Sequence, residues 1–149
     1  MKYAHLIKLS VFSHENEDSQ PILDALLEFF PFNLEDNKVQ IKKTSAEGFN
    51  ERKIEILEVT LAKTNLINQF LKNLLKSLDK GQKNMVLQQA GSRLDKNLDF
   101  FLRFDKDAWL NGKKLAITDS GECFHLKISI AAFPKKGELA LNVINDLFS

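Results

Sequence analysis

A strict two-residue alternation of apolar and polar side chains in residues 123–133 most constrains how this chain folds. The apolar positions of this segment are Phe124, Leu126, Ile128 and Ile130, and the polar positions are His125, Lys127 and Ser129. Because successive side chains of a strand point to opposite faces, the pattern predicts a strand with one buried face and one solvated face. Strands of this kind are typical of antiparallel sheets, whereas strands of parallel sheets are apolar on both faces.

The same alternation recurs earlier in the chain. It predicts further strands at residues 4–13, 38–44, 54–63, 97–105 and 114–118. Within residues 54–63, the apolar parity changes between Ile56 and Leu57, which predicts a β-bulge at that point. The pair Asn111-Gly112 predicts a tight turn before the strand at 114–118.

Helical spacing of apolar residues separates these strands. The clearest stripe predicts a helix over residues 65–80, with Thr64 as its N-cap and Gly81 at its end. Weaker or shorter patterns predict helices at 82–95, between Asp18 or Ser19 and Pro31, and at 136–148. The order predicts an α+β fold, a two-layer sandwich with a mostly antiparallel sheet and helices packed on one face. A length of 149 residues predicts a single domain spanning residues 1–149.

Several classes of function lack their sequence signatures. The six glycines are isolated from one another and form no phosphate-binding loop, and the three histidines lack metal-ligand spacing. We therefore expect no catalytic residue, metal or cofactor. The single cysteine, Cys123, cannot form an internal disulfide, and the first residues resemble neither a signal peptide nor a membrane span. These features predict a cytoplasmic protein with no membrane partner.

Charge is segregated along the chain although the formal net charge is only +1. Residues 9–37 contain no Lys or Arg and seven acidic residues, whereas residues 38–149 contain 19 Lys and Arg against 13 Asp and Glu. Segregation of this kind can produce a positive surface on a protein of low net charge. Such a surface attracts polyanions such as nucleic acid.

The solvated face of the predicted sheet is the main candidate for such a surface. Strand parity places on it Lys8, Phe12, Lys42, Phe101, Arg103, His125 and Lys127. Cations attract phosphates and aromatic rings stack on unpaired bases, so this composition favours RNA. The connection between two strands adds the cations Lys42, Lys43, Arg52 and Lys53, which we expect to clamp backbone phosphates. The competing interpretation is an ordinary solvated sheet face.

Two further functions stay open. Asp105, Asp107 and Asp119 flank neighbouring elements, and converging carboxylates could hold Mg²⁺ for phosphodiester hydrolysis, as in a nuclease. The competing explanation is that Asp caps and solvates turns well. The other alternative is a protein-interaction subunit of a larger complex, whose partner covers an exposed apolar patch.

Three stretches resemble one family of archaeal proteins. These are "SAEG" between two strands, the phrase "LRFDK", and "LAITDSGECFHLKISIAAFPKK". The family they resemble is described as RNA-binding or exosome-subunit-like. The resemblance implies a fold like that of large-subunit ribosomal protein number five. It also implies that the family's characteristic positions are Arg103, Asp105, Lys106, Asp119, Lys135 and Lys136. Of these positions, we expect Arg103, Lys106, Lys135 and Lys136 to face the nucleic acid.

The chain departs from this family in one loop. Family members tend to follow "EG" with a His-rich stretch that contains Gly, whereas this chain reads "EGFNERK" with Phe49 and Asn50. The resemblance therefore implies that any RNA contact made by this loop is altered. Together, residues and resemblance predict a non-catalytic RNA-binding domain, an accessory in RNA processing or ribosome-related work, with RNA and possible protein subunits as its partners.

Overall fold

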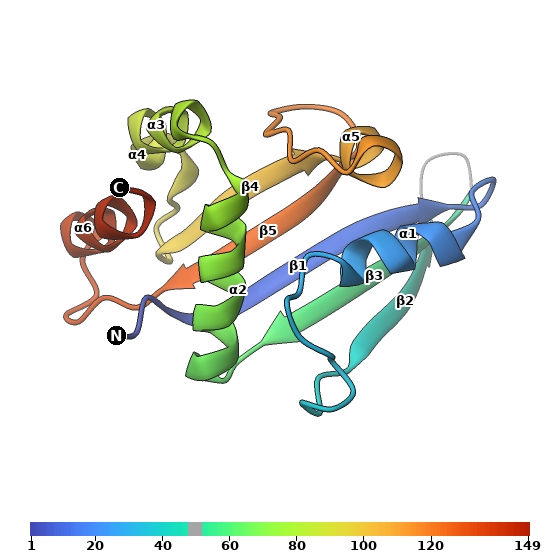
Figure 1. The fold of residues 1–149 in the computed structure, drawn as a ribbon, viewed down its shortest axis with the longest axis horizontal. Helices are drawn as coiled ribbons and strands as arrows, with labels where there is room; N and C mark the ends of the chain where they lie inside the picture. The colour runs from blue at the N-terminus through green and yellow to red at the C-terminus, as the bar shows by residue number, and fades with distance from the viewer. Residues whose placement is uncertain (48–51) are drawn as a thin grey trace. The chain divides into compact units, whose positions relative to one another are not determined.

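The computed structural model describes residues 1–47 and 52–149, which form an α+β fold with a five-stranded antiparallel sheet and six helices. The strands are β1 (Ala4–His14), β2 (Ile41–Glu47), β3 (Lys53–Leu61), β4 (Asp99–Asp105) and β5 (Cys123–Ile130). The helices are α1 (Ser19–Leu27), α2 (Thr64–Ser77), α3 (Lys80–Gln88), α4 (Ala90–Arg93), α5 (Lys106–Gly112) and α6 (Gly137–Phe148). The strand order in the sheet is β2-β3-β1-β5-β4 (Figure 1). The predicted fold class is therefore confirmed.

In β1, β4 and β5, the apolar side chains of the predicted alternation are the ones that are buried. In β5 the apolar parity is buried throughout, whereas Cys123, His125, Lys127 and Ser129 are only half-buried. The predicted bulge in β3 is wrong, because the β2–β3 ladder keeps one register from Ile41↔Val59 to Glu47↔Lys53. The parity change arises instead because Ile54 and Ile56 lie half-exposed on the opposite face from buried Leu57.

The segment between β4 and β5 differs most from the prediction. A helix, α5, replaces the expected turn at Asn111-Gly112, and it ends where Lys113 adopts a left-handed conformation with φ of 52°. The predicted strand at 114–118 contributes only one isolated bridge, between Ile117 and Phe104.

The contacts of the chain divide it into two compact units, so a single domain over residues 1–149 stays a prediction. Unit 1 comprises residues 1–7, 61–102 and 127–149. Its buried residues come from one face of α2 and from β4, β5 and α6, and they include the ring pair Phe100–Phe148, whose centroids are 5.9 Å apart. Helices α3, α4 and α6 contact one another in this unit (Figure 1).

The helix boundaries of unit 1 correct two predictions. Thr64 is the first residue of α2, and the preceding Lys63 occupies the N-cap without a side-chain hydrogen bond. Gly81 does not end this helix, because it lies inside α3, whose N-cap is Asp79. The Asp79 carboxylate accepts from the Gln82 backbone N–H at 2.7 Å, and the Gln82 side chain accepts from the Asp79 N–H at 3.0 Å. This reciprocal pair is a capping box, which stabilises the start of α3.

Unit 2 comprises residues 8–60 and 103–126, of which 48–51 are not described. Helices α1 and α5 contact each other in this unit. Its core centres on Phe29, whose ring lies 4.6 Å from that of Trp109, 5.2 Å from that of Phe124 and 5.9 Å from that of Phe104. The indole N–H of Trp109 donates to the Ala25 carbonyl at 2.8 Å, which ties α5 to α1.

Candidate nucleic-acid interface

The candidate surface is the open face of the strands, which we define as the face opposite their buried side chains. In unit 2 it carries Lys8, Ser10 and Phe12 from β1, while Leu9 and Val11 of the same strand are buried. Phe12 is 46% exposed. The predicted parity of β1 is therefore confirmed, and an aromatic side chain is left on a solvated face.

The side chains of the adjacent cations Lys42 and Lys43 lie on opposite faces of β2. In the β2–β3 register Lys42 lies opposite Glu58 and Lys43 lies opposite Leu57. Glu58 is on the open face, where its carboxylate lies 3.6 Å from the Lys8 ammonium. Because directly opposite residues share a face, Lys42 belongs to the open face and Lys43 to the other.

Three predicted site residues of unit 2 meet at one cavity, which we call the Phe12 cavity. Its volume is about 570 Å³, and its lining residues are Ser10, Val11, Phe12, Arg103, Gly121, Glu122, Cys123 and His125. Burial raises the pKa of the Cys123 thiol, and the nearby Arg103 guanidinium offsets part of that rise. The cavity therefore combines an exposed aromatic ring, a guanidinium, an imidazole and a protonated thiol.

Lys106 is turned into the protein, contrary to the expectation that it faces a polyanion. Its side chain is 5% exposed, and its ammonium donates to the Phe12 carbonyl at 2.7 Å and to Glu17 Oε1 at 2.9 Å. Burial raises the pKa of Glu17, but the hydrogen bonds from Lys106 and the His14 backbone outweigh it, so this pKa is lowered. Lys106 thus anchors the end of β1 and is not a phosphate ligand.

The pairing of His14 with Glu122 was not predicted from the sequence. His14 Nε2 lies 2.5 Å from Glu122 Oε1, and the other Glu122 oxygen lies 3.9 Å from the Lys106 ammonium. The two residues are 108 positions apart, so no local pattern indicates their contact. The parity of β1 indicates only that His14 lies on the same face as Phe12.

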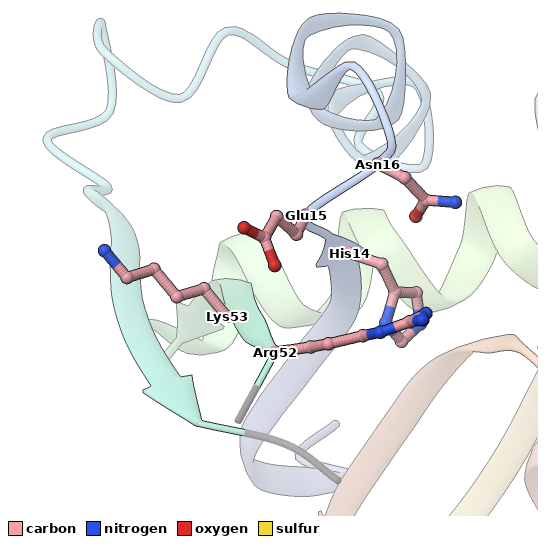
Figure 2. Close-up of a pocket in the computed structure, with 5 residues that line it drawn as sticks. All are labelled: His14, Glu15, Asn16, Arg52 and Lys53. Carbon is pink, nitrogen blue, oxygen red and sulfur yellow. The ribbon is translucent and has the colours of Figure 1, made fainter. Parts of the chain in front are cut away.

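A second cavity lies at the end of β1, with a volume of about 390 Å³. Its lining residues are His14, Glu15, Asn16, Arg52 and Lys53. Figure 2 shows the Arg52 side chain extending towards His14, whereas Lys53 extends away on the other side. Of the four cations expected to clamp phosphates, Arg52 and Lys53 line this cavity. The departure at Phe49 and Asn50 lies outside the described residues.

The other predicted site residues lie in unit 1. Phe101 is half-buried on β4, and the Lys127 ammonium lies 4.0 Å from the Asp99 carboxylate, which also accepts from the Ser129 hydroxyl at 2.6 Å. Lys135 and Lys136 are exposed between β5 and α6, next to Phe133, which is 98% exposed. Lys127 is thus partly neutralised, whereas Lys135 and Lys136 follow an exposed aromatic ring.

Two of the three acidic residues of the nuclease alternative, Asp105 and Asp107, serve local structure. Asp105 is the N-cap of α5 and accepts from the Ala108 N–H at 3.2 Å, and Asp107 accepts from the Asn111 side chain at 2.5 Å. Across residues 1–47 and 52–149, no group of three or more His, Cys, Asp or Glu is arranged to hold a metal ion. The structure therefore gives the nuclease alternative no support.

Comparisons with known proteins identify relatives of this chain and of its fold. RNA-binding protein PAB1135 of Pyrococcus abyssi is 27% identical over 143 residues, which cover 96% of this chain and 92% of that protein. Two solved DUF54 proteins share the fold. AF2318 of Archaeoglobus fulgidus has a TM-score of 0.85 and 27% identity, and covers 97% of this chain and 99% of its own. Mth689 of Methanothermobacter thermautotrophicus has a TM-score of 0.79 and 25% identity, with 99% coverage of both chains.

None of the helices in the described part of the chain is both long and apolar enough to cross a membrane. A family model described as RNA binding matches residues 6–130, and the chain therefore belongs to this RNA-binding family.

Proposed function

We propose that this protein binds RNA through the open face of its unit 2, without cleaving it. The observation that carries the proposal is the Phe12 cavity, where Arg103 and His125 lie around an exposed aromatic ring. Family membership and the name of the Pyrococcus abyssi relative support RNA as the polyanion. Phosphate attraction supplies most of the affinity in such interfaces, and aromatic rings hold unpaired bases.

The cations of this face divide into those that remain available and those that the protein uses itself. Arg103 and Arg52 line the two cavities, and Lys42 lies on the same face as the Lys8–Glu58 pair. Lys106 is buried and holds Phe12 in place. We therefore assign phosphate contacts to Arg103, Arg52 and Lys42, and assign Lys106 to the framework that supports them.

A salt titration tests this assignment. Filter binding of single-stranded RNA by the wild type should weaken steeply as salt increases, because bound counterions are released. Arg103→Ala should weaken binding several-fold and reduce the slope of log K against log[salt] by about 0.7, the value for one phosphate on a single strand. Adding Lys127→Ala should weaken binding further if the open face of unit 1 also contributes. A double variant that binds like the wild type would refute the proposal.

Lys42 and Lys43 provide a matched control, because they are adjacent, carry the same charge and lie on opposite faces of β2. Lys42→Ala should reduce RNA affinity, whereas Lys43→Ala should leave it close to that of the wild type. Equal losses in the two variants would indicate that net charge, and not the open face, governs binding.

The cellular role follows as a separate proposal. We infer an accessory role in RNA processing or ribosome-related work, and a cytoplasmic location, from the resemblance to exosome-subunit-like proteins. Affinity purification from native extract, with and without ribonuclease, tests this role. Protein subunits that persist after ribonuclease treatment would indicate a direct protein interface, whereas loss of all partners would show that RNA alone connects them.

A further inference from the structure

We propose that the Phe12 cavity receives one unpaired base of the bound RNA, with the base stacked on the Phe12 ring. This inference rests on the proposed RNA-binding function and specifies the part of the RNA that the site selects. The cavity volume of about 570 Å³ lies within the usual range for small-ligand pockets. The described residues that line it all belong to unit 2.

The stacking surface is held in position by the buried lysine. Phe12 is 46% exposed, while its backbone carbonyl accepts the hydrogen bond from the Lys106 ammonium at 2.7 Å. An aromatic ring whose backbone is fixed loses little conformational freedom when a base stacks on it. Phe12 is thus a preformed platform, and base stacking on such platforms is tolerant of sequence.

The rim of the cavity supplies polar groups suited to a nucleotide. The exposed Arg103 guanidinium can donate to a phosphate or to the acceptor edge of a base. The Glu122 carboxylate, fixed by His14, can accept from the amino group or ring N–H of a base. A positive group and a carboxylate at one aromatic ring match a nucleotide better than they match a simple anion, which the carboxylate would repel.

The two cavities are joined by the His14–Glu122 contact. Glu122 lines the Phe12 cavity, and His14 lines the second cavity together with Arg52. A base in the Phe12 cavity would therefore have a further cation nearby for an adjacent phosphate. In an A-form duplex the bases are paired and stacked inside the helix, so only an unpaired nucleotide can place its base in this cavity.

The cavity contains its own reporter, because Cys123 lines it and is the only cysteine of the chain. The test measures the rate of Cys123 alkylation by iodoacetamide with saturating RNA and without RNA, at an alkaline pH that increases the thiolate fraction. A short single-stranded RNA of mixed sequence should slow alkylation several-fold. The same strand in a perfect duplex, and a ribose-phosphate oligomer without bases, should leave the rate unchanged.

Substitution of Phe12 separates stacking from charge. Phe12→Ala should abolish the protection of Cys123 and weaken binding of single-stranded RNA by about 5- to 150-fold, the range for loss of one base–aromatic stack. Phe12→Trp should restore both readouts. Because the ring is exposed, Phe12→Ala should keep the circular dichroism spectrum and melting temperature of the wild type, and this check shows that the variant is folded.

The outcomes distinguish this inference from the proposed function. If single-stranded RNA binds in the filter assay but leaves Cys123 alkylation unchanged, the base pocket is refuted while RNA binding stands. Equal protection by the duplex or the base-free oligomer would also refute the pocket. If no RNA binds at any salt concentration, both the pocket and the proposed function are wrong.

Discussion

The buried ammonium of Lys106 offers the sharpest test of how unit 2 is held together. Its two hydrogen bonds, to the Phe12 carbonyl and to Glu17, join α5 to the end of β1 and the turn before α1. Lys106→Met keeps most of the side-chain volume and removes the charge, so it leaves no large cavity. It also removes the ammonium donor from the Phe12 carbonyl and from the Glu17 carboxylate, which still accepts from the His14 backbone N–H.

The expected cost follows from the exposure of the two partners. Breaking a fully buried ion pair costs about 3–5 kcal/mol, and a single hydrogen bond to a charged group is worth about 1.5–3 kcal/mol. Glu17 is 31% exposed and can regain some hydration after the substitution, so the upper value does not apply. We expect Lys106→Met to reduce the free energy of unfolding by about 2–3 kcal/mol.

Urea unfolding followed by tryptophan fluorescence measures this loss. Trp109 is the only tryptophan and lies in α5, the helix that begins at Lys106. With a typical urea dependence for a small domain, the midpoint should fall by about 1 M. Glu28→Gln is the matched control, because it breaks the exposed pair of Glu28 with Lys113 and should cost under about 1 kcal/mol. Equal midpoints for Lys106→Met and Glu28→Gln would refute the reasoning.

Three further predictions concern single groups. The pKa of Glu17 is lowered in the folded state, so its contribution to stability is present at neutral pH and is lost as pH falls below the usual Glu value of about 4.3. The melting temperature of Glu17→Gln should therefore decrease less than that of the wild type over this acidic range. An unchanged profile would contradict this prediction. Asp79→Ala removes the capping box of α3 and should lower the free energy of unfolding in urea by about 1 kcal/mol; no change would show that the cap is energetically silent. Burial raises the pKa of Cys123, so alkylation of the free protein should be slower at neutral pH than that of a free thiol and should accelerate above the ordinary thiol pKa of about 8.5; a rate equal to that of a small thiol at neutral pH would oppose this.

Much of the fold was predictable because its elements carry local patterns. The alternation in β1 and β5 predicted which side chains are buried, and the apolar stripe of α2 predicted its packing face. These patterns survive in the sequence because a strand or helix with one buried face needs apolar residues at a fixed period. The open face, with Phe12, Arg103 and His125 on it, was therefore predictable as well.

Helix α5 shows where local patterns fail. Its seven residues include Asn111 and Gly112, which favour a turn, and a helix this short is marginal without tertiary support. That support comes from Trp109, which packs on Phe29 and donates to the Ala25 carbonyl. The supporting residues are some 80 positions earlier in the chain, so the sequence near α5 contains no sign of them.

The period of the apolar residues was enough to predict the five strands of the sheet, their buried side and the side chains of the open face, although it also predicted a strand at 114–118 where the structure has an isolated bridge. Tertiary structure alone decided that Lys106 is an internal anchor and that Phe12, Arg103 and Glu122 line one cavity. The reason is physical, because Lys106 and Phe12 are 94 positions apart and contacts over such separations form only when the chain folds back on itself. A charge or a ring in the sequence shows which interaction is possible, but its burial and its neighbours determine whether the protein uses that group itself or presents it to a ligand.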